Sequence, residues 1–225
     1  NITGSFASGE GLASVTVSGT QTHAGSSDNV VTGYTLKDSK SASNYVIATA
    51  KGTLTVSKAA YNAVVASGYA GVYDSAPHGI TAVPAVPETA GTTLFYSTDY
   101  NPTTETGAWS TTAPKFTDAG TYTVYVKAVN PDFTADAMDH ATVEIATAPL
   151  TITAGSKAFV YDGNAHSDNS WTITSGKLLG TDAISVVVSG GITNVSESPV
   201  TNTVGDVAFT SGRASNYTVT KVNGT

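Results

Sequence analysis

The sequence SNYVIATAKGT at residues 43–53 recurs, with changes, as SNYTVTKVNGT at residues 215–225. In the first copy, a further alternating segment, LTVS, follows the glycine at residues 54–57. Because Asn-Gly is the strongest short signal for a tight hairpin, Asn223-Gly224 predicts a strand, a turn and the start of a second strand. Lys51-Gly52 takes that place in the first copy. An internal repeat of this kind indicates a protein built from modules.

The composition excludes several classes of protein. The chain has 225 residues, no Cys and a net charge of −7, and only 12% of its residues are charged, about half the usual share. A nucleic-acid partner is not expected without clustered Lys and Arg. Disulfides and thiolate chemistry are impossible without Cys. No apolar run is long enough to span a membrane, and the abrupt start without a sorting signal predicts a segment of a longer polypeptide.

Alternation of apolar and small polar residues with a period of two predicts an all-β fold. Val15 and Val17 are expected on one face of a half-buried strand, and Tyr122, Val124 and Val126 on one face of another. The composition GSSDN at residues 25–29 is typical of a turn. No window has a sustained helical period. Residues 59–67 are compatible with one short helical turn, but Val64-Val65 suits a strand equally well.

Three modules are predicted from the repeat. Residues 1–57 form module A, the C-terminal part of a module; residues 58–148 form module B, of a different type; residues 149–225 form module C, which is of the same type as module A but lacks its last strand. Gly190 lies 171 positions after Gly19, and Tyr217 lies 172 positions after Tyr45. The junction at residues 146–149 is too short to act as a flexible linker.

The motif YDGNAH at residues 161–166, with its variant YDSAPH at residues 73–78, resembles the YDG and MBG repeats of large bacterial surface proteins. In that pattern an LTIT strand precedes YDG, and an NYxI strand leads into GTLTV. This chain has LTIT at residues 150–153, NYVI at 44–47 and GTLTV at 52–56. Module B, with DAGTYTV at residues 118–124, is similar to the companion repeat type, although Ser75 replaces the motif glycine. The Asp118 to Tyr122 segment also resembles the tyrosine corner of immunoglobulin-like sandwiches.

The resemblance implies tandem Ig-like β-sandwich modules in an elongated array, with β-grasp-like sheets as the alternative. It implies a non-catalytic stalk of a secreted or surface-anchored, adhesin-like protein, extracellular and without a cofactor. Its partners would be other repeats of the same polypeptide. Two other functions stay open: a module that binds a host or environmental glycan or glycoprotein, and a self-assembling filament or surface-layer subunit whose open strand edges are completed by another chain.

Aromatic residues in polar surroundings are the candidate binding residues, because such rings anchor sugars and protein partners. They are Trp109, Tyr100 and Tyr96. Trp171 lies on a predicted strand and is equally compatible with the core.

The paired YD…H motifs permit a catalytic reading, in which His is a base and Asp orients it. No nucleophile recurs at a fixed spacing, so we expect a structural role instead, with Asp closing a turn, the Tyr ring packed and the His on the loop. The residues with this predicted structural role are Tyr73, Asp74, His78, Tyr161, Asp162 and His166, together with Asp118 and Tyr122. No enzymatic activity is expected.

The one acidic cluster is the weak candidate for a cation site. It contains Asp132, Asp136 and Asp139. Calcium needs six or more oxygen ligands, often from alternate positions of one loop, and this spacing matches no loop of that type, so a solvated acidic rim is favoured. An isopeptide bond between Lys157 and Asn216 is a further possibility, although no acid is clearly placed between them.

Overall fold

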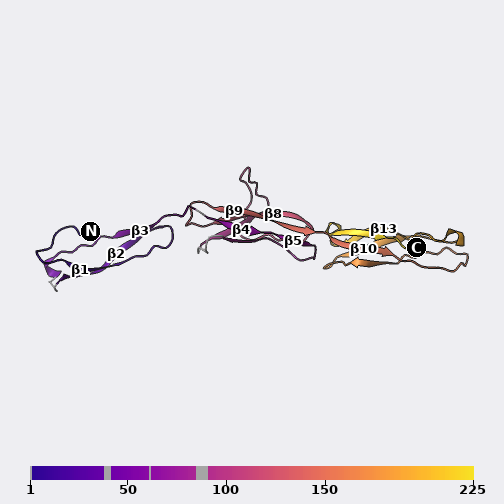
Figure 1. Ribbon diagram of the computed structural model, residues 1–225, viewed down its shortest axis with the longest axis horizontal. Helices are drawn as coiled ribbons and strands as arrows, with labels where there is room; N and C mark the ends of the chain where they lie inside the picture. The colour runs from indigo at the N-terminus through magenta and orange to yellow at the C-terminus, as the bar shows by residue number, and fades with distance from the viewer. Residues whose placement is uncertain (1, 38–41, 61, 85–90) are drawn as a thin grey trace. The chain divides into compact units, whose positions relative to one another are not determined.

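A computed structural model describes residues 2–37, 42–60, 62–84 and 91–225 (Figure 1). Over these residues the chain is all-β, as predicted, and contains three short 3₁₀ helices but no α-helix. The strands are β1 (Leu12–Ser18), β2 (Gly25–Leu36), β3 (Gly52–Val56), β4 (Val64–Ser67), β5 (Tyr69–Val72), β6 (Thr81–Pro84), β7 (Thr93–Ser97), β8 (Gly120–Val129), β9 (Ala137–Ala146), β10 (Ala148–Ala154), β11 (Trp171–Gly176), β12 (Ala183–Ser189), β13 (Thr203–Ser211) and β14 (Tyr217–Val222). The 3₁₀ helices are η2 (Ala42–Asn44), η3 (Val195–Glu197) and η4 (Ala214–Asn216).

The chain divides into two compact units. Unit 1 contains Asn1–Ala63, Val86–Thr93 and Ala128–Ala137, and unit 2 contains Val64–Ala85, Leu94–Lys127 and Met138–Thr225. The division follows packing rather than sequence repetition, so the three-module scheme of residues 1–57, 58–148 and 149–225 stays a prediction.

Unit 1 is built on a three-stranded antiparallel sheet in the order β1-β2-β3. Hydroxyl pairs cross this sheet: Ser14 and Thr35 lie 2.6 Å apart, and Ser26 and Thr55 lie 3.1 Å apart. Val15 and Val17, predicted to be half-buried, are 47% and 55% exposed. Of the described residues between 2 and 60, none is fully buried. This sheet is therefore held by its backbone ladder and hydroxyl pairs rather than by a core.

Unit 2 contains several small sheets, in the orders β5-β9-β8-β7, β4-β6, β11-β10-β14 and β12-β13. Two pairings are parallel, β5 with β9 and β10 with β14. The predicted shared face of β8 is confirmed, because Val124 and Val126 are completely buried. Leu150 and Ile152 of β10 are also buried. Alternate residues of β8, β9 and β10 thus form the core, as the period of two predicts.

The predicted hairpin at Asn223-Gly224 is wrong. β14 pairs with β10, whereas Gly224 exchanges backbone hydrogen bonds with Asn202, immediately before β13. A Cβ atom on Gly224 would lie 2.1 Å from the carbonyl oxygen of Gly155. The glycine therefore permits a close backbone approach where the chain passes from one strand partner to another, and not a tight turn. In the first copy, likewise, β3 begins at Gly52 and pairs with β2.

One other local prediction is also wrong. Residues 25–29 begin strand β2 instead of forming a turn, because each pairs with a residue of β3. Here strand pairing outweighs a weak local preference, which is common for β-structure. Where the sequence left a helical turn and a strand open, the structure has the strand: residues 64–67 form β4, which pairs with β6.

Candidate functional site

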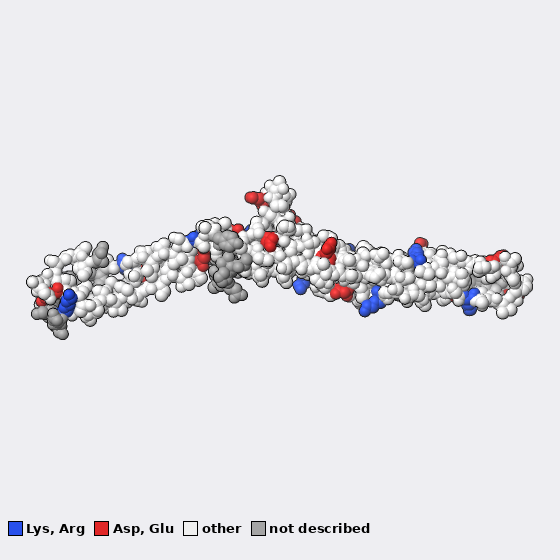
Figure 2. All heavy atoms as spheres, viewed as in Figure 1, with Lys and Arg blue, Asp and Glu red and all other residues white. Residues whose placement is uncertain are grey.

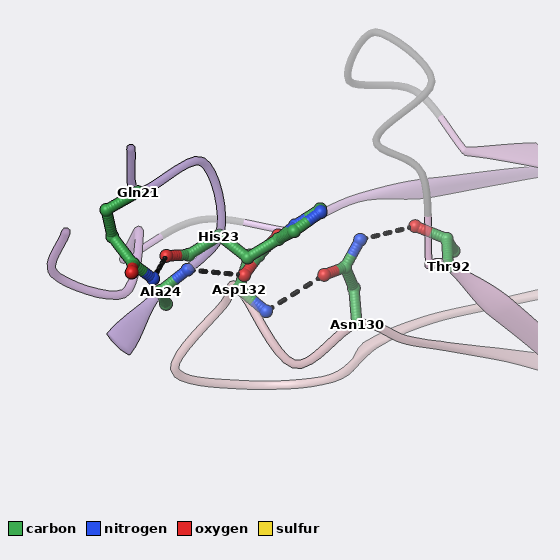
Figure 3. A network of polar contacts seen from close by, with 6 residues as sticks. All are labelled: Gln21, His23, Ala24, Thr92, Asn130 and Asp132. Atoms are coloured by element: carbon green, nitrogen blue, oxygen red, sulfur yellow. Dashed lines mark hydrogen bonds and ion pairs between the residues drawn. The ribbon is translucent and has the colours of Figure 1, made fainter. Parts of the chain in front are cut away.

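The loop that follows β8 forms a polar joint in unit 1, drawn in Figure 3. Asn130 is buried and shapes this loop: its Oδ1 atom accepts the backbone N–H of Asp132 at 2.9 Å, and its Nδ2 atom donates to the Thr92 hydroxyl at 2.7 Å. An Asx turn of this type fixes the direction of the next side chain. The Asp132 carboxylate is thereby presented to the segment between β1 and β2.

The Asp132 carboxylate holds that segment with both oxygens. Its Oδ2 atom lies 2.7 Å from Nδ1 of His23, and its Oδ1 atom accepts the backbone N–H of Ala24 at 2.7 Å (Figure 3). The His23 hydrogen bond, followed by that from Ala24, lowers the pKa of the Asp132 carboxyl. The Asp132 carbonyl also accepts the backbone N–H of Ala59 at 2.8 Å. Asp132 therefore connects two segments of the chain to the loop after β8: the segment between β1 and β2, and Ala59, which follows β3.

A second polar joint lies in unit 2, around Asp182. Its Oδ2 atom accepts the Tyr73 hydroxyl at 3.0 Å and the Tyr217 hydroxyl at 2.7 Å, and the two rings meet edge to face. The Tyr217 hydroxyl also accepts the backbone N–H of Leu179 at 2.8 Å. Burial, followed by the Asp182 hydrogen bond, raises the pKa of Tyr217 to about 12. The carboxylate thus joins a residue of predicted module B to two elements of predicted module C.

Asn216 extends the same joint and is the most deeply buried polar side chain in the described part of the chain. Its Nδ2 atom donates to Oδ1 of Asp118 at 3.0 Å, and its Oδ1 atom accepts the backbone N–H of Ala119 at 2.8 Å. Arg213 lies 3.4 Å from the other Asp118 oxygen. Because a buried amide must be hydrogen-bonded, this pairing fixes the Asp118 turn against the end of η4.

Unit 1 repeats part of this arrangement. The Tyr45 hydroxyl donates to Glu10 and accepts the backbone N–H of Ala7 at 3.1 Å. Glu10 and Ala7 thus correspond to Asp182 and Leu179, at the same offset of 172 that separates Tyr45 from Tyr217. The offset of 171 that relates Gly19 to Gly190 would instead place Glu10 opposite Thr181, one residue before Asp182.

The two YD…H motifs have the same geometry. His78 Nε2 lies 2.9 Å from Asp74 Oδ1, and His166 Nε2 lies 2.9 Å from Asp162 Oδ1. Each Asp also accepts the backbone N–H two residues later, at 2.9 Å. These contacts lower both carboxyl pKa values; the largest cause is the His78 hydrogen bond for Asp74 and a backbone N–H for Asp162.

The imidazoles of these motifs are packed. His78 stacks on Tyr69 with ring centroids 3.9 Å apart, and His166 stacks on Phe159 at 4.7 Å. The backbone of each His pairs with a distant residue, Phe116 or Ile192. The expectation of a packed Tyr ring holds for the buried Tyr73 but is wrong for Tyr161, which is 61% exposed. Tyr73 has a partner in Asp182, whereas no hydrogen bond to another described residue is found for Tyr161.

Tyr122 has the contact that defines a tyrosine corner, because its hydroxyl donates to the carbonyl of Asp118 at 3.1 Å. Its ring stacks on Phe116 with centroids 4.0 Å apart.

The predicted binding aromatics belong to a larger cluster in unit 2, here termed the aromatic face. Trp109 lies 5.1 Å from Tyr100, and Tyr100 lies 5.2 Å from Tyr125, measured between ring centroids. Lys127 Nζ lies 4.6 Å from the Trp109 centroid, at cation–π distance. The aromatic face comprises Phe95, Tyr100, Trp109, Tyr125, Lys127 and His140.

Trp109 is half-buried within this face rather than isolated on a polar turn. Tyr96 follows Phe95 on β7 and pairs with Ser110 through its backbone. Because successive side chains of a strand point to opposite faces, Tyr96 belongs to the other side of the sheet. The sequence did not identify Tyr125, Lys127 and His140 as members of this cluster. The one sequence feature that could have indicated them is their position on the outward side of β8 or β9. Binding by Trp109, Tyr100 and Tyr96 stays a prediction.

The three acidic candidates do not come together as a metal site. Asp132 is engaged by His23 and Ala24, and Asp139 accepts the backbone N–H groups of Ala66 and His140. Asp136 is exposed. Over the described residues, no group of three or more His, Asp or Glu side chains is arranged to hold a metal ion. The amide of Asn216 is likewise occupied by Asp118 and Ala119, and Lys157 lies over the Phe159 ring.

Charged side chains are spread thinly over the surface that Figure 2 shows, most of which is formed by uncharged residues. Comparison with protein families, with curated proteins and with solved structures found no significant match to this chain. In the part of the chain that the structure describes, no helix has the length and apolar character needed to cross a bilayer.

Proposed function

We propose that this chain is a non-catalytic structural segment of a secreted or surface-anchored bacterial protein of the YDG/MBG repeat type. In this proposal, Ig-like sandwich modules follow one another in an array that extends and displays a binding tip. The observation that carries the proposal is the Asp182 joint, in which Tyr73 and Tyr217 share one carboxylate across the predicted boundary between modules B and C.

Three further observations support a stiff tandem segment. Asn216 and Asp118 bridge the same predicted boundary with a second set of hydrogen bonds. The Asp132 joint supplies a comparable contact in unit 1. The Tyr45 and Glu10 pair repeats the Tyr217 and Asp182 pair, which is expected where one joint design recurs along a polypeptide.

The proposal is tested by loosening the joint. In Asp182→Ala, the two tyrosine hydroxyls lose their shared acceptor, so we expect small-angle scattering to show a broader distribution of maximum dimensions than for the wild-type chain. Asp206→Ala, at an exposed position of β13, is the matched control and should behave as wild type. If the two variants scatter alike while both remain folded, the Asp182 joint does not stiffen the chain and the proposal loses its support.

The aromatic face supports a second candidate, the binding of a glycan or glycoprotein. Aromatic side chains stack on the apolar side of sugar rings, and Lys127 adds a hydrogen-bond donor beside Trp109. A glycan array should then give saturable binding that is lost in Trp109→Ala and retained in Tyr161→Ala, which changes an exposed ring outside the aromatic face. Equal binding by both variants would exclude this candidate.

A further inference from the structure

The loop between β7 and β8 holds two rings of the aromatic face in position. At its base, Tyr96 and Ser110 exchange backbone hydrogen bonds of 2.7 and 2.9 Å. Further along, the Oδ1 atom of Asp99 accepts the backbone N–H of Ala108 at 3.0 Å. These bonds tie the two arms of the loop together, so Trp109 lies between two anchored residues.

Gly107 allows the two arms of this loop to approach each other closely. A Cβ atom at this position would lie 2.6 Å from the Cα atom of Tyr100, so a larger residue would push the arms apart. Tyr100 stands in one arm and Trp109 in the other, and the close approach leaves their ring centroids 5.1 Å apart. Because the rings are positioned before any ligand arrives, binding would order little of the protein.

Lys127 of β8 is a half-buried cation placed among these rings. Its Nζ atom lies 4.6 Å from the Trp109 centroid and 5.8 Å from the Phe95 centroid. Cation–π attraction offsets part of the hydration that a half-buried ammonium loses. It provides no oxygen acceptor for the N–H donors of the ammonium, and no hydrogen bond or ion pair joins Lys127 Nζ to another described residue.

The missing counter-ion is informative in this chain. Asp and Glu number 17 against 10 Lys and Arg, so acidic partners are in excess. Lys51 pairs with Asp28, for example, and Arg213 with Asp118. A half-buried ammonium without an acid is unfavourable, and an apolar side chain of similar length would pack among the same rings without that penalty. The charge of Lys127 therefore does not serve stability, which points to a ligand.

The other polar groups near the face leave the Lys127 ammonium available. Asp99 is engaged within the loop by the Ser97 hydroxyl at 2.7 Å and by Ala108. Glu105 is exposed in the outer part of the loop. His140 is exposed beside Tyr125, with ring centroids 5.3 Å apart, and an imidazole can donate a hydrogen bond to a sugar hydroxyl.

We propose that the aromatic face binds an acidic saccharide, with a sugar ring against Trp109 and Tyr100 and the sugar carboxylate at Lys127 Nζ. This inference rests on the second candidate function given above, glycan binding, and specifies the class of glycan. The rings match the apolar side of a pyranose, and the ammonium supplies charge-assisted hydrogen bonds to a carboxylate. A neutral glycan would leave the ammonium without an anion, so it should bind more weakly.

The test uses the whole chain and three acidic saccharides, each compared with its own methyl ester. The acids are trigalacturonate, a hyaluronan tetrasaccharide and sialyllactose. Esterification keeps the sugar rings and hydroxyl groups and removes the charge. Isothermal titration calorimetry should show saturable binding of at least one acid, and its ester should bind about tenfold more weakly or worse, because it lacks the charge-assisted hydrogen bonds.

Substitutions then locate the anion. In Lys127→Met, which keeps the length of the side chain and removes its charge, the acid should bind as weakly as its ester. In Trp109→Ala, binding of both should be lost. Lys177→Met, at an exposed lysine that follows β11, is the matched control and should bind as wild type. Lys127→Met should also melt at the wild-type temperature or above it, because an uncompensated half-buried charge is removed.

Each contrary result has a separate meaning. Equal binding of every acid and its ester by the wild-type chain would overturn the acidic class and leave glycan binding intact. A preference for the acid that persists in Lys127→Met, or a lowered melting temperature with unchanged binding, would make Lys127 a packing residue. If no member of the panel binds, the inference fails, and the glycan array described above decides independently whether the face binds a neutral glycan.

Discussion

At the scale of single residues, this chain relies on carboxylates that hold hydroxyl and backbone N–H groups. Tyr217 and Tyr45 occupy the repeated SNY sequence, and each donates to an acid, Asp182 or Glu10. The repeat identifies the tyrosines, but the acids differ in type and lie 35 residues away in sequence. Only the folded chain shows which carboxylate each hydroxyl reaches.

The raised pKa of Tyr217 predicts an alkaline limit to stability. A Tyr whose folded pKa is about 12, above its ordinary value near 10, stabilises the fold fully below pH 10, and this contribution is lost as the pH rises through 12. Tyr217→Phe should cost about 1–2 kcal/mol at pH 8 through the lost hydrogen bond, and its stability should fall less steeply between pH 10 and 12. Urea unfolding at pH 8 and at several pH values between 10 and 12 measures the free energy of unfolding of each chain. Tyr161→Phe, at an exposed ring, should match wild type; an unchanged slope in Tyr217→Phe would contradict the assignment.

The lowered pKa of Asp132 predicts an acid limit in unit 1. A carboxylate with a depressed folded pKa stabilises the fold above its unfolded pKa of about 4, and this contribution is lost as the pH falls through the folded value. The protection factor of the Ala24 amide, its observed exchange compared with the intrinsic rate at the same pH, should therefore fall below about pH 4 in the wild-type chain. In Asp132→Asn the amide should exchange faster at neutral pH and lose this acid dependence. Asp136→Asn, at an exposed carboxylate, serves as the control, and protection that is the same in all three chains would rule out the Asp132 joint.

At the scale of elements, glycines mark the places where a strand ends and the chain moves to a different partner. Gly68 separates β4, which pairs with β6, from β5, which pairs with β9. A Cβ atom there would lie 2.3 Å from the Thr142 carbonyl oxygen. Gly224 has the same kind of contact with the Gly155 carbonyl. From sequence, such a glycine is easily taken for a hairpin turn, because the close approach comes from a strand distant in the chain.

Gly68→Ala should therefore destabilise unit 2. The added methyl group would overlap backbone atoms that cannot rotate away, so β5 or β9 must shift, at an expected cost of about 2 kcal/mol or more. Thermal unfolding followed by circular dichroism measures the change. Gly33→Ala is the control, because nothing lies within 4 Å of its added Cβ, and it should be neutral or slightly stabilising. Similar melting temperatures for the two variants would contradict the close approach.

At the scale of the whole molecule, burial is distributed unevenly along the chain. The fully buried aliphatic side chains lie on β8, β9 and β10 of the described chain, whereas residues 2–60 contribute none. Because hydrophobic burial is the main favourable term in folding, the two units should differ in local stability.

Hydrogen exchange should reveal this difference directly. We expect amides of β8 and β10 to be protected for far longer than those of β1 and β2, with residues 12–36 exchanging through local opening rather than global unfolding. Mass spectrometry of peptic fragments over a time course would measure both regions in one sample. Equal protection of β2 and β10 would show that the unit 1 sheet has a source of stability beyond its ladder.

The sequence by itself determined the all-β class, the inward face of β8 and the recurrence of the SNY and YD…H motifs, because each depends on spacing within one segment. Tertiary structure decided the rest. The partners of Asp132, Asp182 and Asn216, the crossing at Gly224 and the membership of the aromatic face all depend on segments separated by many residues. Local patterns specify which face of a strand is apolar, but they do not specify which strand lies beside it. That choice is made by long-range backbone pairing and burial, which appear only when the chain is folded.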